Sequence, residues 1–448
     1  MKQKLLNLYF SFFALLAKNY IKKYNPYIIW ITWSIWKTSS RMIINEILQK
    51  YLNDKIVYTS KKNFNWELGL SLSILWISDY EPKILWVLKT IINSLKISLF
   101  WKKLYDIVVL EYWIDHIWEM DFLLSIAKPD ISLITKIDKV HSSQFESKEI
   151  IAKEKYKLAL NTTKIVFLNY DDEFAFKYQN EIKCEKYFYT TNIALNNEKI
   201  DLKWKNYDLK LIENIIKTSF SLYLQNLKKI NITSNLVWEE NIWYINIWFL
   251  ILEKLFFKFY NLSFFKENFD KTLDINSILQ YSRFSLFDWI EDSILIDSSY
   301  NRAPESMKKV IDNFFKISSS IFPKYKTILC LGEMRELWDY TKDEHEKLAN
   351  FIENKSQEIF IVWDSMKKYF LPINKKAKHF KNSKILWEFL KKFLSKTEEK
   401  YLILFKWSQN TIFMEEALKQ ILKNYVDKQK ICRQEDFWIE KKEKFFLK

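Results

Sequence analysis

A lysine followed by a threonine, Lys37 and Thr38, stands between a short apolar run and a segment with helical spacing. The run at 28–31 predicts a buried strand, and the apolar residues from about 41 to 52 predict a helix. Strand, loop, Lys-[Ser/Thr] and helix are the plan of a phosphate-binding loop. In such a loop backbone N–H groups cradle phosphate oxygens, the lysine reaches the terminal phosphates and the hydroxyl binds Mg²⁺. The spacing therefore predicts a nucleotide site with Mg²⁺.

Two tryptophans, Trp33 and Trp36, stand where this loop needs glycine for a tight turn and a close approach to phosphate. The chain has 2 glycines and 19 tryptophans in 448 residues, whereas ordinary usage of about 7% would give roughly 30 glycines. Trp363 and Trp407 also follow apolar runs, where a turn favours glycine. We infer that many of these tryptophans are glycines in the cell, because the gene uses UGA for glycine and was translated with a table that reads UGA as Trp.

The bulk composition narrows the class of protein. The length predicts two or three domains, and the net charge of +15 without a basic block suits nucleotides or phosphorylated substrates better than nucleic acid. The three cysteines, Cys184, Cys330 and Cys432, lie too far apart to indicate a disulfide framework or a zinc cluster. We expect a reduced, cytoplasmic protein.

The most apolar stretch, residues 5–17, is too short to span a bilayer, which takes about 20 residues. Lysines precede it as in a signal peptide, but Lys18, Asn19 and Tyr20 follow in place of a cleavage site. We expect an amphipathic helix packed on the next domain, without stable membrane insertion. A contact with a membrane surface is the alternative.

Acidic and imidazole side chains are predicted at the same sheet edge as Lys37. Glu111 lies near the end of a predicted strand at 104–113, and His141 follows another at 129–137. In open α/β sheets ligands bind at the carboxyl ends of the strands. Glu111 is thus placed like the acidic Mg²⁺ partner of a phosphate-binding loop, and His141 like a second ligand.

Strands alternate with helices along most of the chain, which predicts an α/β protein with a doubly wound, mostly parallel sheet. The pattern includes a strand at 55–60, a helix at 147–160, a strand at 164–169 and a helix at 245–259, while residues 180–235 cannot be assigned. A second, Rossmann-like α/β domain follows, with strands at 293–297, 325–331, 359–362 and 401–405. The expected domains are residues 1–26 (an N-terminal helix), 27–281 (ATP-binding) and 282–448 (C-terminal).

With Trp taken as Gly, an ordered set of motifs resembles the Mur ligases, and among them the MurF type. The set comprises 31–38 (I-T-W-S-I-W-K-T against I-T-G-S-x-G-K-T), 110–121, 128–141, 151–155, 297–306, 331–338 with His345, and 406–415 (K-W-S…M-E against K-G-S…M-E). The motifs run in family order from residue 28 to the end of the chain, and the last two are typical of the MurF type.

The resemblance implies an ATP-dependent, ADP-forming amide ligase of peptidoglycan precursor synthesis. ATP would phosphorylate the C-terminal carboxylate of UDP-N-acetylmuramoyl-tripeptide, and the amine of D-alanyl-D-alanine would then displace phosphate. The cofactors implied are ATP and Mg²⁺. We expect a monomer that binds no nucleic acid.

The resemblance also implies roles for individual residues. The catalytic residues would be Lys37, Glu111, His141 and Lys155. Mg²⁺ would be held by Thr38, Glu111, His141 and Lys155, the last as a carbamate. ATP would be bound by Trp33, Ser34, Ile35, Trp36, Lys37, Thr38, Ser39, Asn241, Arg283, Asp297 and Asn301. Lys406 and Ser408 would bind substrate. The C-terminal domain would have to close over the site.

Some features depart from the family pattern. The phosphate-binding loop lies close to the start of the sequence, so we expect the usual N-terminal domain that binds the UDP-sugar to be missing or replaced. Lys136, Ser298 and Gln409 replace the usual Asn, Asp and Arg, and we assign them no role.

Two alternatives stay open. One is another amide ligase of the superfamily, such as a folylpolyglutamate-like or poly-amino-acid ligase. The other takes the tryptophans literally and predicts a non-catalytic protein that binds nucleic acid by base stacking and phosphate contacts.

Overall fold

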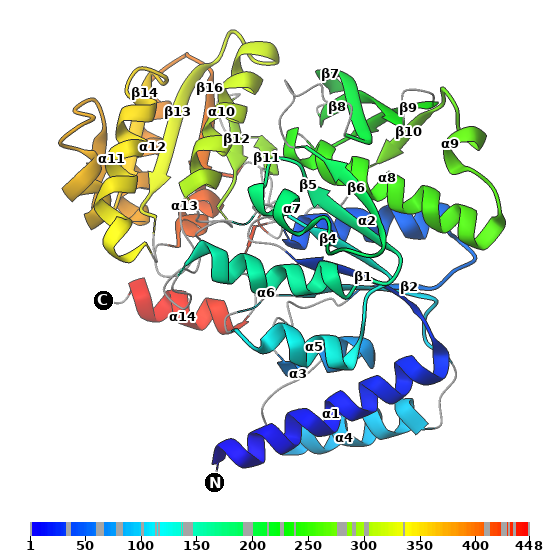
Figure 1. The fold of residues 1–448 in the computed structure, drawn as a ribbon. Coiled ribbons are helices and arrows are strands. Elements are labelled where there is room, and N and C mark those ends of the chain that lie inside the picture. The colour runs from blue at the N-terminus through cyan, green and yellow to red at the C-terminus, as the bar shows by residue number, and fades with distance from the viewer. Residues whose placement is uncertain are drawn as a thin grey trace. The chain divides into compact units, whose positions relative to one another are not determined.

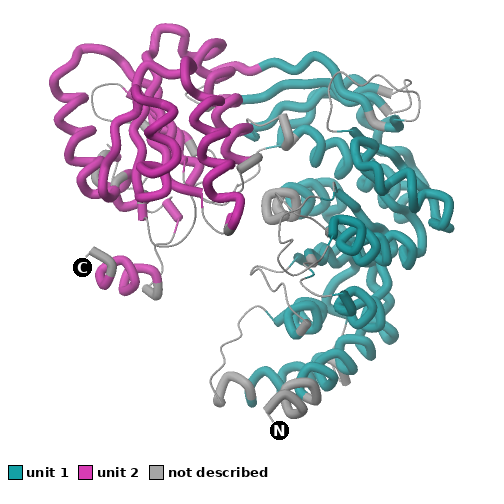
Figure 2. Tube along the Cα trace, turned by 60° about the vertical axis from the view of Figure 1, so that its left-hand side comes forward, with its two compact units in different colours: residues 1–208, 217–278 teal, residues 209–216, 279–448 magenta. Residues whose placement is uncertain are grey.

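The chain folds into two compact units, residues 1–208 with 217–278 (unit 1) and residues 209–216 with 279–448 (unit 2) (Figure 2). The computed structural model describes residues 2–32, 37–59, 67–77, 84–99, 103–112, 114, 117–135, 137, 147–190, 200–212, 215–224, 228–236, 239–275, 285–288, 293–299, 304–334, 337–406, 413–422, 428, 431–432 and 436–446. Each unit contains a six-stranded sheet with helices on both faces (Figure 1).

The sheet of unit 1 is parallel throughout, as the sequence predicted. Its order is β2-β3-β1-β4-β5-β6, and every pairing in it is parallel. Burial on both faces accounts for the continuous apolar runs. The strands are β1 (Tyr27–Thr32), β2 (Val57–Thr59), β3 (Ile107–Tyr112), β4 (Ile131–Ile134), β5 (Ile165–Asn169) and β6 (Glu185–Tyr189). The strands expected at 55–60, 104–113 and 129–137 are shorter than predicted, because apolar residues continue beyond the ladder into the connections.

Helices cover both faces of this sheet (Figure 1). Ile28 and Trp30 of β1 belong to the core that α1, α3, α5 and α6 complete. Because side chains alternate along a strand, Ile29 and Ile31 point to the opposite face, which α2 and α8 cover. The helices are α1 (Lys2–Tyr24), α2 (Lys37–Tyr51), α3 (Glu67–Ile74), α4 (Ile84–Leu99), α5 (Glu119–Ile126), α6 (Lys148–Leu160), α7 (Glu173–Tyr178), α8 (Glu239–Tyr260) and α9 (Phe264–Glu267).

The first helix is an integral part of unit 1. Phe13, Ala17 and Tyr20 of α1 are fully buried, and the Tyr20 hydroxyl accepts the Leu104 N–H at 2.8 Å. The helix contacts α3, α4 and α5. This is the amphipathic packing expected for residues 5–17. Across the helices that the structure describes, none has the length and apolar character that crossing a bilayer requires.

A second, smaller sheet follows the first, in the region that the sequence left unassigned. Its order is β10-β9-β8-β7, with β8 antiparallel to β9 and β9 parallel to β10. The strands are β7 (Leu202–Ile212), β8 (Ile215–Leu224), β9 (Lys228–Ser234) and β10 (Thr272–Ile275). Helix α8 is longer than the predicted 245–259 and lies between β9 and β10 in the chain.

Unit 2 has the α/β architecture expected of the last third. Its sheet order is β11-β12-β16-β13-β14-β15, parallel except for β11 at the edge. The strands are β11 (Ser285–Asp288), β12 (Ile294–Asp297), β13 (Lys326–Gly332), β14 (Glu358–Val362), β15 (Lys378–Phe380) and β16 (Tyr401–Lys406). The four strands predicted here agree with β12, β13, β14 and β16 to within one residue at either end. The α-helices are α10 (Pro304–Ser320), α11 (Thr341–Ile352), α12 (Ser383–Leu394), α13 (Met414–Ile421) and α14 (Asp436–Phe446).

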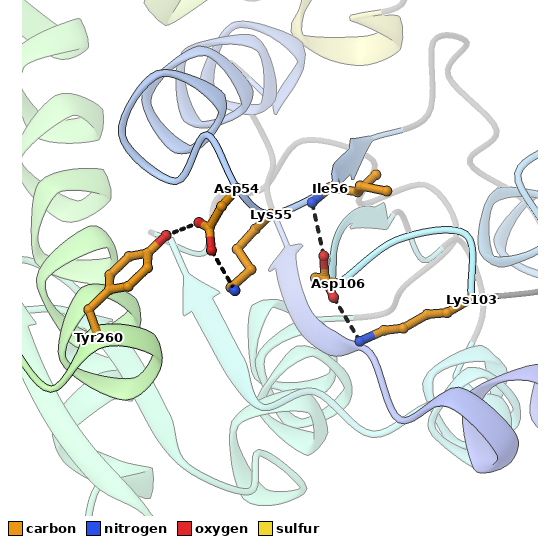
Figure 3. A network of polar contacts seen from close by, with 6 residues as sticks. All are labelled: Asp54, Lys55, Ile56, Lys103, Asp106 and Tyr260. Atoms are coloured by element: carbon orange, nitrogen blue, oxygen red, sulfur yellow. Dashed lines mark hydrogen bonds and ion pairs between the residues drawn. The ribbon is translucent and has the colours of Figure 1, made fainter.

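Carboxylates fix the amino ends of the strands in unit 1 (Figure 3). Asp106, just before β3, accepts the Ile56 N–H at 3.0 Å and the Lys103 ammonium at 2.8 Å. Asp54 binds Lys55 at 2.8 Å and also accepts the Tyr260 hydroxyl of α8. These contacts tie β2, β3 and α8 together at the edge opposite the carboxyl ends.

Tryptophan occurs both in turns and inside regular elements. Trp363, directly after β14, has φ 98°, and Trp76 has φ 56°, a region that glycine adopts at little cost. However, Trp30 in β1 and Trp248 in α8 are fully buried within their elements. The prediction of a turn at Trp363 is therefore confirmed, and Trp30 and Trp248 lie inside the strand and the helix predicted at 28–31 and 245–259.

Candidate functional site

The nucleotide site predicted from Lys37 lies at the carboxyl edge of the unit 1 sheet. Strand β1 ends at Thr32, and Lys37 is the first residue of α2. Strand β1 lies between β3 and β4. The chain runs from β1 to β2, on the far side of β3, whereas β4 lies on the other side of β1, so the strand order reverses at β1. Ligands of open α/β sheets bind at such a reversal. The amino end of α2 points its free N–H groups and its positive dipole end toward this edge. The backbone therefore has the strand-to-helix plan of a phosphate site.

Glu111 lies at this same edge. It pairs in register with Ile31 across the parallel β1–β3 ladder, one residue before β3 ends, and is half-buried. Neighbouring strands are about 4.8 Å apart, so the backbone of Glu111 lies beside the last residues of β1. A carboxylate oxygen is a ligand that Mg²⁺ prefers, and the position suits that ion.

Most other predicted site residues fall outside the part of the chain that the structure describes. These are Trp33, Ser34, Ile35, Trp36, His141, Arg283, Asn301 and Ser408. Lys37, Thr38 and Ser39 are placed in α2, and Asn241 in α8, by backbone alone. Among the side chains that are described, no three His, Cys, Asp or Glu residues gather as a metal site.

Lys155 is buried in α6. It is 9% exposed, whereas Lys153 two residues earlier is exposed, so Lys155 is not a solvated surface lysine. Lys155 lies on the apolar stripe of α6 with Ile151 and Leu158, and this helical spacing was visible in the sequence. Ser147 begins the helix by accepting the Ile150 N–H at 3.3 Å.

The neighbour of Lys155, Glu154, was missed by the sequence analysis. It is 1% exposed, accepts the Met120 N–H at 3.1 Å and pairs with Lys157 at 2.6 Å. Burial raises the pKa of the Glu154 carboxyl, while the Lys157 contact opposes that shift. Glu154 thereby fixes the first turn of α5 to α6 beside Lys155.

Asp172 anchors the connection that leads to His141. Its carboxylate accepts the Ile137 N–H at 3.1 Å and the Phe174 N–H at 3.2 Å, the latter as the N-cap of α7. Burial raises the pKa of Asp172, and the two backbone N–H groups oppose the rise. In the sequence, Asp172 was visible as part of an Asp pair directly after the predicted strand 164–169. Nothing in the sequence indicated that its carboxylate binds the N–H of Ile137.

In unit 2, Asp297 and Lys406 end neighbouring strands. Asp297 of β12 is paired in register with Phe405 of β16, and Lys406 is the next residue. They are 0% and 1% exposed. Asp297 accepts the Ser299 N–H at 3.1 Å, which turns the chain directly after the strand. Asp297 and Lys406, the predicted nucleotide and substrate residues of this unit whose side chains the structure describes, thus lie at the carboxyl edge of its sheet.

Two further buried groups are Glu333, directly after β13, and His345 of α11, which contacts the residue after Glu333. Glu333 is 5% exposed and accepts the Ser365 N–H at 3.3 Å. His345 is fully buried and accepts the Met334 N–H through Nε2 at 3.1 Å, while its Nδ1 lies 2.7 Å from the Thr341 carbonyl oxygen. Burial lowers the pKa of His345, which favours the neutral ring. Glu333 was not among the predicted site residues.

A buried ion pair joins the last two helices. Glu415 of α13 and Lys442 of α14 have side chains 0% and 6% exposed, with Nζ and Oε1 3.4 Å apart. Lys442 also contacts Glu416 at 2.8 Å. The pair holds α14 on the helix that follows β16 and the predicted substrate segment.

Comparison with known proteins gives a consistent result. Residues 31–243 match the Mur ligase middle domain. The UDP-N-acetylmuramoyl-tripeptide–D-alanyl-D-alanine ligase of Buchnera aphidicola is 26% identical over 406 residues, covering 90% of this chain and 78% of that protein. The ligase of the same name from Bacillus subtilis is 24% identical over 423 residues, covering 91% and 79%.

Solved structures share the fold. MurF from Acinetobacter baumannii superposes with a TM-score of 0.68 at 17% identity, over 91% of this chain and 79% of that one. MurF from Thermotoga maritima in complex with ADP gives 0.67 at 17% identity, over 92% and 82%. A bifunctional folylpolyglutamate synthase/dihydrofolate synthase from Yersinia pestis gives 0.51 at 12% identity, over 88% and 90%. The fold is thus more similar to that of these MurF structures than to that of this folylpolyglutamate synthase.

Proposed function

For a chain with a Mur ligase middle domain and the MurF fold, we propose ATP-dependent, ADP-forming joining of D-alanyl-D-alanine to UDP-N-acetylmuramoyl-tripeptide. The observation that supports this best is the position of Lys37 at the start of α2. This helix follows β1, and β1 pairs with β3, which carries Glu111. The resemblance of motifs in both units supports the same substrates. We place the reaction in the cytoplasm, where ATP and nucleotide-linked precursors are found, and propose that a monomer carries it out.

Unit 1 would bind the phosphates of ATP. Residues 33–36 would wrap the β- and γ-phosphates, Lys37 would neutralise charge on the transferring phosphoryl group, and Thr38 and Ser39 would complete the loop. Glu111 and Thr38 would hold one Mg²⁺, and His141 with carbamylated Lys155 a second. Bound Mg²⁺ would stabilise the negative charge that develops on the phosphate oxygens. Asp172 would position the His141 segment through its bond to Ile137.

The reaction would proceed in two displacements. A carboxylate oxygen of the tripeptide attacks the γ-phosphorus and ADP leaves, giving an acyl phosphate. The amine of D-alanyl-D-alanine then attacks the acyl carbon, and the tetrahedral intermediate expels phosphate and loses a proton to give the amide. Lys37 would act in the first displacement, in which negative charge spreads over the phosphoryl oxygens.

Unit 2 would complete the site. Arg283, Asp297 and Asn301, with Asn241 of α8, would contact the nucleotide, and Lys406 with Ser408 would bind substrate. Asp297 and Lys406 are buried at the carboxyl edge of their sheet, which supports these roles. We propose residues 27–281 as the ATP-binding domain and 282–448 as the C-terminal domain.

The test is an assay of phosphate release with Trp33→Gly and Trp36→Gly in the same chain. We expect release only when ATP, UDP-N-acetylmuramoyl-tripeptide and D-alanyl-D-alanine are all present. The unchanged chain should bind little ATP, because we expect the two indoles to occupy the space meant for phosphates. Activity with a folate and glutamate instead would favour the folylpolyglutamate-like alternative. Tight ATP binding by the unchanged chain would contradict the glycine assignment.

A further inference from the structure

Helix α4 exposes aliphatic side chains and buries hydroxyls. Leu88 and Ile92 are 52% and 51% exposed, whereas Thr90 and Ser94 are 3% and 0% exposed. Residues four apart share a face of a helix, so each pair forms a stripe. Ile91, Leu95 and Ile97 pack on the core, as in other helices that face water. Leu88 and Ile92 add a second apolar stripe on the outer side, where such a helix normally has polar residues. We refer to Leu88, Lys89, Ile92, Asn93 and Lys96, all exposed, as the α4 face.

The charged residues of helices α4 and α1 are all positive. Helix α4 contains Lys89 and Lys96 and no acidic residue, and both lysines are exposed. Helix α1, which packs beside α4 (Figure 1), contains five lysines and no acidic residue. Its Leu15 is 57% exposed, and Lys18 and Lys22 are exposed as well. Each of the two helices therefore exposes both aliphatic groups and ammonium groups.

A single exposed leucine needs no explanation, because folded proteins expose much apolar surface. The outer apolar stripe of α4 does need one, since its side chains gain nothing from contact with water. Its partner must accept aliphatic side chains and carry negative charge. An anionic lipid surface offers both, because acyl chains receive the leucine and isoleucine while headgroup phosphates attract lysines. The long lysine side chains can reach the headgroups while their methylene groups stay in the apolar layer.

We propose that the α4 face, with the lysines of α1, docks unit 1 reversibly on an anionic membrane surface. The anchor is shallow, since it consists of a few aliphatic side chains and no spanning segment. Docking of this kind depends on both lipid charge and salt, because lysine attraction is screened within a Debye length of the surface. The proposal is independent of the ligase reaction.

The test is co-sedimentation of the full chain with vesicles. We expect binding to vesicles of phosphatidylcholine and phosphatidylglycerol at three to one, little binding to phosphatidylcholine alone, and release in 0.5 M NaCl. Leu88→Ser with Ile92→Ser should weaken binding at least tenfold. Lys89→Gln with Lys96→Gln should weaken vesicle binding about thirtyfold, because each lysine near the surface contributes slightly more than about fivefold.

Matched controls come from α12 of unit 2. Ile385→Ser removes an aliphatic side chain that is 43% exposed, and Lys391→Gln with Lys392→Gln removes two exposed lysines. Both should bind vesicles like the unchanged chain, and thermal unfolding should show that every variant is folded. Equal binding to both kinds of vesicle, no binding, or equal losses in the controls would overturn the proposal. A dimer that Leu88→Ser with Ile92→Ser dissociates would also overturn it, by assigning the face to a second copy.

Discussion

The imidazole of His345 accepts the backbone N–H of Met334 through Nε2 at 3.1 Å, inside the core of unit 2. An acceptor nitrogen carries no proton, so the proton of the neutral ring is on Nδ1, which donates to the Thr341 carbonyl 2.7 Å away. The ring thereby joins the start of α11 to the segment that follows β13 and carries Glu333. This link exists only while His345 is neutral.

Acid should therefore weaken unit 2 through His345. Burial lowers the pKa of the folded ring below 6.5, so the unfolded chain binds the extra proton first as pH falls. The stabilisation is complete above pH 6.5 and is lost toward the folded pKa, at up to about 1.4 kcal/mol per pH unit. Urea unfolding of the unchanged chain and His345→Gln between pH 8 and 4.5 checks this. The variant should lack that part of the slope, and parallel curves would refute the assignment.

Removing the ammonium of Lys442 should destabilise unit 2. Lys442→Met leaves the carboxylate of Glu415, 0% exposed, without this cation, at a cost of about 3 kcal/mol. Adding Glu415→Gln should recover much of the loss, because it removes the buried charge. Lys326→Met, which breaks the exposed pair with Glu399, should leave the denaturation midpoint nearly unchanged. Equal midpoints for Lys442→Met and the unchanged chain would count against the buried pair.

Glycine should fit better than alanine at Trp363. Both replacements lose the packing of the indole on the core, but only alanine keeps a Cβ at φ 98°. Trp363→Gly should be more stable than Trp363→Ala by about 1–2 kcal/mol. At Trp387, inside α12, the order should reverse by about 1 kcal/mol, because glycine weakens a helix. The same order at both positions would remove the backbone argument. Mass spectrometry of the native chain should find glycine at 363.

Asp172 should matter for both stability and turnover. Asp172→Ala removes the acceptor of two buried N–H groups and should cost about 2 kcal/mol. It should also lower kcat of the glycine-restored protein, because the segment before His141 loses its anchor. Asp121→Ala, which removes a carboxylate that is 64% exposed, is the matched control and should change neither quantity much. A stable Asp172→Ala with full turnover would show that the anchor is dispensable.

The sequence predicted the parts of the fold that follow from local apolar runs. Such runs predicted β1 to β5 of unit 1, β12, β13, β14 and β16 of unit 2, and the placement of Glu111, Asp297 and Lys406 at strand ends. They also predicted α2, although from about residue 41, whereas it begins at Lys37. Strands β6, β11 and β15 were not predicted. The sheet of β7 to β10 escaped because its strands are half-exposed and polar, and because β10 pairs with β9 only after α8 and α9 intervene.

Three buried carboxylates near the site were not predicted, for a different reason. Glu154, Asp172 and Glu333 act through backbone N–H groups of Met120, Ile137 and Ser365, which are distant in the chain. Spacing along a sequence describes one element at a time, and these contacts depend on how elements meet. Lys155 was accessible to sequence reasoning, because its position on the apolar stripe of α6 already marked it as buried.

The packing of α1 has a consequence for synthesis on the ribosome. Helix α1 is synthesised before the helices it contacts, α3, α4 and α5, the last of which ends at Ile126. Until then Phe13, Ala17 and Tyr20 have nowhere to bury, and the most apolar segment of the chain stays open to water. Nascent chains in this state aggregate readily. The buried residues of α1 are thus made well before they are protected, and a chaperone that holds them through translation of α5 would raise the yield of folded protein.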